Sequence, residues 1–162
     1  MKTASIHQLK SELHAMEPQQ IAEICLKLAK FKKENKEFLD YLVWGSNDSG
    51  LYVEEVKLEV SEMFENIQRD RNFYFVKKSI RKIQRFVNRY CKYLIEKELC
   101  CELRMFYIES LIQFIQDWNY QAQAHKIVQA ELSKIEALIG KLHEDYQFDY
   151  TLRYNELKDK MC

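Results

Sequence analysis

Apolar side chains recur every three or four positions through most of the chain, which is the spacing of one face of an α-helix. This pattern predicts a short helix over residues 6–16 and a second helix over 18–31, because Pro18 suits the first turn of a helix. The polar residues 32–37 form either a tight turn or a kink, and both alternatives stay open at this point. Residues 38–44 then resume the apolar pattern.

The segment 45–50 reads Gly-Ser-Asn-Asp-Ser-Gly and is the clearest loop in the sequence. These residue types favour turns because their side chains compete locally for backbone hydrogen bonds or permit unusual backbone angles. We therefore expect a single helical domain, 1–162, in which this loop joins an N-terminal helical module (1–44) to a main helical bundle (51–162).

Further apolar stripes predict helices over residues 51–67, 75–94, 103–118, 127–142 and 150–161. The stretch 103–118 is apolar on nearly all sides, and such a helix is surrounded by other helices. We expect an all-α fold with about six or seven helices in antiparallel hairpins. The hairpins form either a compact bundle or an irregular stack like that of helical repeats.

Composition supports long helices with short joints. The chain has three glycines and one proline in 162 residues, whereas average usage predicts about 11 and about 8. Lysine plus arginine equals aspartate plus glutamate at 25 each, so the net charge favours no anionic partner. Any such role must come from local clustering of charge.

One local cluster stands out on the predicted helix around 76–97. Its outer side carries a basic stripe, spaced at alternating steps of four and three residues: Lys78, Lys82, Arg85, Arg89 and Lys92. One interpretation is the solvated face of an amphipathic helix, either by itself or paired with the glutamates of the helix over 51–67, which would offset most of its charge. The other is a contact surface for anions, either a nucleic acid or an acidic protein.

A second basic patch follows the helix over 18–31 and has a local explanation, since cations are favoured at a helix C-terminus. Its members are Lys27, Lys30, Lys32, Lys33 and Lys36.

Residues typical of catalysis and metal binding are scattered. The histidines show no metal-ligand spacing, the five cysteines include no C-x-x-C pair, and three glycines cannot build a phosphate loop. Glu109 and Asp117 interrupt the apolar stretch 103–118, and we expect each to be a structural carboxylate with a partner. We predict no enzyme activity, no metal, no cofactor and no small-molecule ligand.

The cysteine usage and the lack of a leader or of an apolar run of about 18 residues predict a cytoplasmic protein that does not span a membrane.

Four segments carry a family resemblance: Ile6-x-x-Leu9-Lys10-x-x-Leu13, Leu26-x-Leu28-x-Lys30, Lys36-Glu37-Phe38-Leu39 and Cys101-Glu102-Leu103-Arg104-Met105-Phe106-Tyr107-Ile108-Glu109. Over nearly the whole chain the sequence resembles a family of bacterial helical proteins known only as a domain of unknown function. The resemblance implies an all-helical cytoplasmic protein and brings no catalytic residue, cofactor or partner.

These observations favour a non-enzymatic helical module for protein interaction or scaffolding, with a protein partner or self-association. The alternative is a nucleic-acid-binding module that uses the basic stripe of the helix around 76–97.

Overall fold

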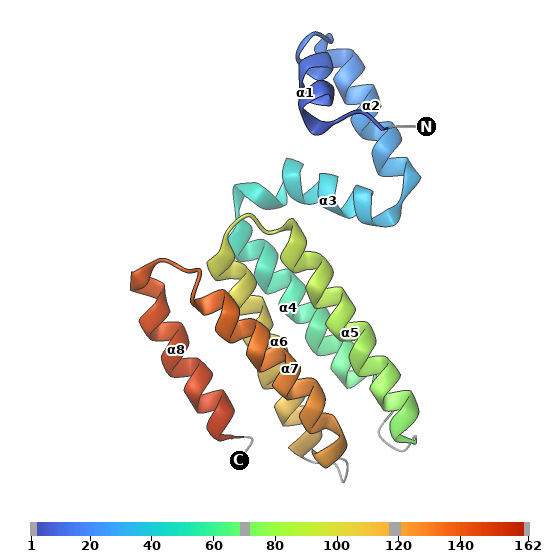
Figure 1. Cartoon of the computed structure of the whole chain (residues 1–162). Coiled ribbons are helices and arrows are strands. Elements are labelled where there is room, and N and C mark those ends of the chain that lie inside the picture. Colours follow the sequence, from blue (N-terminus) through green and yellow to red (C-terminus); the bar gives the residue numbers. More distant parts are fainter. Residues whose placement is uncertain (1–2, 69–71, 117–120, 161–162) are drawn as a thin grey trace. The chain divides into compact units, whose positions relative to one another are not determined.

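The computed structural model describes residues 3–68, 72–116 and 121–160 of the chain. Within these ranges it contains eight α-helices, one short 3-10 helix and no strand (Figure 1). The predicted all-α fold is therefore confirmed. The helices belong to two compact units, Met1–Asn47 and Asp48–Cys162.

The first unit contains α1 (Ile6–His14), α2 (Pro18–Phe31) and α3 (Lys33–Val43). Ser5 begins α1 in a capping box with Gln8, and Pro18 occupies the first turn of α2, as its fixed backbone angle favours. Lys32 alone separates α2 from α3, because its backbone is extended, with φ −144° and ψ 146°. The polar segment 32–37 is thus a one-residue break followed by a new helix, which accounts for a helix beyond the expected six or seven.

The expected loop over 45–50 is wrong in its extent. Residues Gly45–Asn47 form the 3-10 helix η1, and α4 already begins at Ser49. The reason is the side chain of Asp48, which accepts a hydrogen bond from the backbone N–H of Leu51 at 2.9 Å and caps α4. A turn-forming residue here starts a helix instead of extending a loop.

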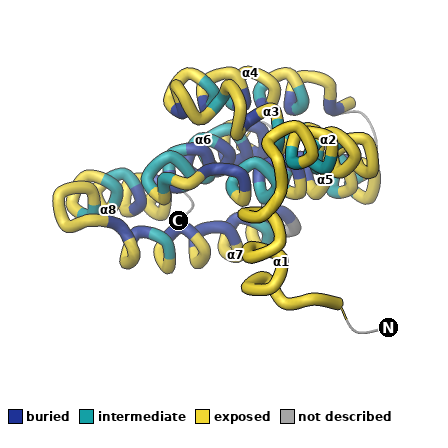
Figure 2. The backbone as a smooth tube through the Cα atoms, turned by 90° about the horizontal axis from the view of Figure 1, so that it is seen from above, coloured by how far each residue is buried: buried dark blue, intermediate teal, exposed yellow. Residues whose placement is uncertain are grey.

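The second unit is a helical bundle of α4 (Ser49–Glu65), α5 (Phe73–Tyr93), α6 (Lys97–Gln116), α7 (Gln121–Ile139) and α8 (Glu144–Asp159). Helices that follow one another in the chain pack side by side, and α6 contacts each of the other four. Buried residues accordingly recur along α6, which is mostly buried or half-buried (Figure 2). The prediction of a helix surrounded by other helices is confirmed.

Several helices begin earlier than their apolar stripes suggest, because the first turns of α6, α7 and α8 are largely polar. Between the predicted helices 51–67 and 75–94, residues 69–71 lie outside the described residues, and the side chain of Asn72 caps α5. Asp117 and Trp118, and hence the predicted end of the helix over 103–118, also lie outside the described residues.

Candidate nucleic-acid interface

Helix α5 has two faces of opposite character. The residues Val76, Ile80, Ile83 and Val87 are buried and fix one face of the helix against the bundle. The opposite face carries exposed cations that recur along the helix axis. We call these the exposed basic row, and its members are Lys78, Lys82, Arg85 and Lys92.

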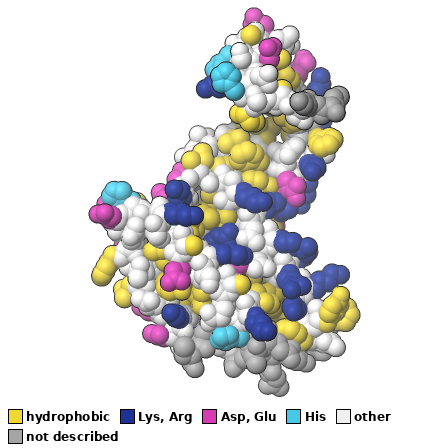
Figure 3. Space-filling model, in the orientation of Figure 1, with side chains coloured by type: hydrophobic (Ala, Val, Ile, Leu, Met, Phe, Trp, Pro, Cys, Tyr) yellow, Lys and Arg dark blue, Asp and Glu magenta, His cyan; other side chains and the backbone are white. Residues whose placement is uncertain are grey.

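None of the cations in the exposed basic row forms an ion pair with a described aspartate or glutamate. The glutamates of α4, which were the expected cover, are exposed, and Glu54 pairs with Lys57 of its own helix at 2.7 Å. Lysine and arginine side chains therefore gather at the surface over α5 (Figure 3). The possible acidic cover by α4 is therefore not seen within the described residues, and the basic stripe is either a solvated helix face without a cover or a contact surface for anions.

Arg89, the fifth member of the predicted basic stripe, is placed differently. It is only partly exposed, and its guanidinium carbon lies 5.6 Å from the centre of the Phe86 ring and 5.5 Å from that of Tyr90. Stacking on aromatic rings is a structural use of arginine. The structure thus brings four of the five predicted residues together on one solvent-facing row.

A surface hollow adjoins the N-terminal half of this row. Its volume is about 440 Å³, and it is lined by Tyr74, Lys77, Lys78, Arg81, Gln84 and Arg85. The ring of Tyr74 is 68% exposed and meets Phe75 edge-on, with ring centres 5.5 Å apart. The exposed aromatic side chain and the cations of α5 therefore share one surface.

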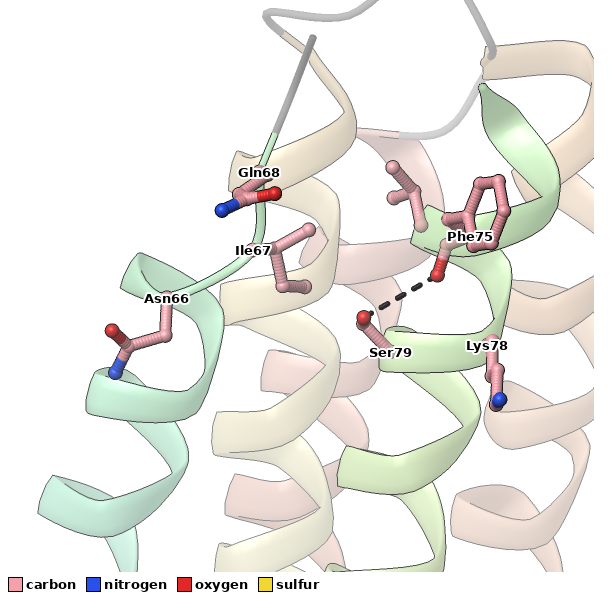
Figure 4. A pocket seen from close by; sticks show the side chains of 7 residues that line it. Asn66, Ile67, Gln68, Phe75, Lys78 and Ser79 are labelled. Atoms are coloured by element: carbon pink, nitrogen blue, oxygen red, sulfur yellow. Dashed lines mark hydrogen bonds between the residues drawn. The ribbon is translucent and has the colours of Figure 1, made fainter. Parts of the chain in front are cut away.

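Lys78 also lines a second hollow, of about 400 Å³, between the end of α4 and the start of α5 (Figure 4). The polar residues Asn66, Gln68 and Ser79 surround it together with the apolar Ile67 and Phe75. The Ser79 hydroxyl donates to the Phe75 carbonyl at 3.3 Å and so is already used within α5. This hollow extends the polar surface beside the row.

Four cations of the bundle form ion pairs, in contrast to the row: Lys57, Arg104, Lys134 and Arg153. Glu102 of α6 accepts hydrogen bonds from Lys57 at 2.8 Å and from Arg153, and Arg153 also reaches Glu109 at 3.3 Å. Burial alone would raise the pKa of Glu102, but the hydrogen bonds from the two cations outweigh it and lower that pKa. Burial would lower the pKa of Lys57, yet its hydrogen bonds to Glu102 and Glu54 raise it. The predicted partner of Glu109 is confirmed.

A fully buried carboxylate, Glu131 of α7, was missed by sequence reasoning. It is 0% exposed and is held by Arg104 at 3.1 Å, by Gln84 at 2.6 Å and by Lys134. Arg104 donates its other nitrogen to Asn88 at 2.9 Å, so both charges are hydrogen-bonded. The signal was available, because Glu131 shares the inward face of α7 with the buried Val128 and Ile135.

The remaining candidate groups add no further site. The second basic patch is exposed, and its Lys33 pairs with Glu37 at 3.5 Å on α3. Across the described ranges, histidine, cysteine, aspartate and glutamate side chains do not gather in threes around a common point that could hold a metal ion. Nor does any helix in the described part of the chain combine the length and apolarity that crossing a bilayer requires.

Comparison of the chain with protein-family models, with curated proteins and with solved structures yields no match. The resemblance to a bacterial helical family stays a prediction. Any functional conclusion must therefore be built from the geometry of this chain.

Proposed function

We propose that the chain is a non-enzymatic nucleic-acid-binding module whose contact surface is the exposed basic row of α5. The observation that supports the proposal is that its four cations are exposed and form no ion pair with a described acid. By contrast, Lys57 and Arg153 pair with Glu102, and Arg104 and Lys134 pair with Glu131. A one-signed row adds little to stability, since exposed charges contribute at most about 1 kcal/mol each.

The dimensions of the row suit a phosphate backbone. Lys78 and Lys92 lie about 21 Å apart along the helix axis at a rise of about 1.5 Å per residue. A nucleic-acid strand carries a phosphate about every 3.4 Å along a duplex axis, so several phosphates fit beside the row. The exposed ring of Tyr74 next to Lys77 and Lys78 favours a single strand, because unpaired bases can stack on it.

Fluorescence anisotropy with labelled single strands and duplexes of RNA and DNA tests the proposal. We expect single strands to bind most tightly, and the affinity to fall by roughly 10²-fold between 50 and 200 mM salt for about four phosphate contacts. The variant K78Q/K82Q/R85Q/K92Q should lose most of this affinity and most of the salt dependence. Arg89 is left intact because it packs on aromatic rings.

A matched control carries the same loss of charge elsewhere on the second unit. The variant K126Q/K141Q/K158Q/K160Q also removes four exposed cations. It should bind nearly as the wild type does. If both quadruple variants lose affinity equally, or if the wild type binds no nucleic acid at 50 mM salt, the proposal is wrong.

A second candidate function, protein interaction through self-association, is supported by the first unit. Helices α2 and α3 form an apolar groove of about 330 Å³ lined by Cys25, Leu28, Ala29, Asn35, Phe38, Leu39 and Leu42. Phe31 and Trp44 of the same unit are 77% and 68% exposed, and contiguous exposed apolar surface is typical of interaction sites. Light scattering after size-exclusion chromatography should show a dimer that F31S/W44S converts to a monomer; a monomeric wild type would contradict this.

A further inference from the structure

Two cysteines meet where α5 ends and α6 begins. Cys91 lies in the last turn of α5 and Cys100 in the first turn of α6. The Cys91 thiol donates to the backbone carbonyl of Cys100 at 3.7 Å, so Cys91 lies directly against the residue that carries the second thiol. Both side chains are partly exposed, so a small solute can reach them.

The surroundings of the pair make its two thiols unequal. The adjacent Cys91 side chain, and then the positive charge of Arg104, lower the pKa of the Cys100 thiol to about 7, although burial opposes this. The adjacent Cys100 side chain, together with burial, raises the pKa of Cys91. Cys100 is therefore the thiolate of the pair near neutral pH, and Cys91 keeps its proton.

We propose that Cys91 and Cys100 form a peroxide-reactive dithiol that closes reversibly to a disulfide between α5 and α6. The proposal is independent of nucleic-acid binding, because neither cysteine belongs to the exposed basic row. It also differs from the behaviour of a single exposed thiol, since the nucleophile and the resolving group are both present and in contact.

The reaction has two steps. The Cys100 thiolate attacks one oxygen of hydrogen peroxide; an S–O bond forms, the O–O bond breaks, and the departing hydroxide takes a proton from solvent and becomes water. The Cys91 sulfur then attacks the sulfenic sulfur of Cys100; an S–S bond forms, the S–O bond breaks, and hydroxide leaves as water with the Cys91 proton. Two thiols are oxidised to one disulfide, and one peroxide is reduced to two waters.

The neighbouring cysteine does not compete for the oxidant. Cys101 is 0% exposed, and burial raises the pKa of its thiol to about 12. A thiol that is protonated and shielded from solvent reacts slowly with peroxide. Cys25 lies in α2, which belongs to the first unit.

Peptide mapping under non-reducing conditions tests the assignment. After treatment with one equivalent of hydrogen peroxide, the full chain should lose two hydrogen atoms per molecule and regain them with dithiothreitol. Cleavage after lysine and arginine should yield peptide 90–92 cross-linked to peptide 98–104. Fragmentation of the second peptide should place the bond on Cys100 and not on Cys101.

Two variants separate the roles of the thiols. In C91S the sulfenic acid of Cys100 should persist and react with dimedone, whereas in the wild type the disulfide removes it first. In C100S both the dimedone adduct and the cross-link should be lost. The control C25S/C162S should form the cross-link at the wild-type rate. Oxidation that yields no bond between Cys91 and Cys100, or equal dimedone labelling of wild type and C91S, would overturn the proposal.

Discussion

The two units share a helical pattern but differ in how they use it. In the first unit Tyr41 alone among the described residues is a buried hydrophobic side chain, whereas the described helices of the second unit each contribute several. The apolar stripe of α2 includes Leu28 and Phe31, which are 56% and 77% exposed. The stripe of α4 includes Val53, Val56 and Val60, which are at most 4% exposed.

The difference teaches that periodicity and burial are separate properties. An apolar residue every three or four positions is enough to predict a helix, and it predicts α2 and α4 equally well. It does not say whether another element covers the stripe. Stability in this chain should therefore be concentrated in the second unit.

The largest loss of stability is expected from Glu131→Ala in the second unit. Removing this carboxylate leaves Arg104 buried, with a side chain 14% exposed, and without its ionic partner. Losing one member of a buried ion pair costs about 3–5 kcal/mol of unfolding free energy. Urea denaturation monitored by circular dichroism measures the change.

The matched control is Glu23→Ala in the first unit, because Glu23 is exposed on α2. This substitution should change the unfolding free energy by less than about 0.5 kcal/mol. Equal losses for the two variants would contradict the contrast between the units.

Leu111→Ala tests the hydrophobic part of the same contrast. Leu111 is 0% exposed in α6, and truncating a buried leucine to alanine costs about 2–5 kcal/mol through lost burial and the cavity left behind. Leu26→Ala is the same substitution at a 56% exposed position of α2. It should cost well under about 1 kcal/mol in the same denaturation experiment. A cost for Leu26→Ala as large as that for Leu111→Ala would show that α2 is buried in solution.

The sequence predicted more of the fold than of the candidate site. The apolar residues on all sides of α6 predicted its central place in the bundle. The alternating steps of the basic stripe predicted that its residues share one face of the helix. The sequence could not show that Arg89 stacks on aromatic rings. Phe86 and Tyr90 are close to Arg89 in the chain, but the orientation of their rings depends on packing. Glu131 was overlooked because charged residues are rarely buried, and its partner Arg104 lies on another helix.

Acid should weaken the second unit through Glu102. Its pKa is lower in the folded chain than in the unfolded one, so its stabilising effect is full above the unfolded pKa of about 4.3 and is lost as the pH falls through the folded pKa. We expect Glu102→Gln to lower stability by about 1 kcal/mol at pH 7, a value reduced for partial exposure. The difference from wild type should shrink toward pH 3.

Urea denaturation at several pH values measures this effect, and Glu23→Gln in the first unit serves as its control. That control should show the same pH dependence as wild type, because its carboxylate is exposed on α2. A difference between Glu102→Gln and wild type that stays constant from pH 7 to 3 would mean that the ion pairs with Lys57 and Arg153 do not stabilise the fold.

The smallest expected change in stability concerns the hydroxyl groups of two tyrosines in the second unit, Tyr107 and Tyr150. The Tyr107 hydroxyl is buried and finds no hydrogen-bond partner among the described residues. Tyr107→Phe keeps the ring packing and removes an unsatisfied polar group, so stability should stay unchanged or rise by up to about 1 kcal/mol. Tyr150→Phe removes a hydroxyl that donates to the Glu98 carbonyl at 3.2 Å, and it should cost about 0.5–1.5 kcal/mol. If Tyr107→Phe proved the more destabilising of the two, its hydroxyl would have a partner in solution, and packing alone would not explain the stability of this unit.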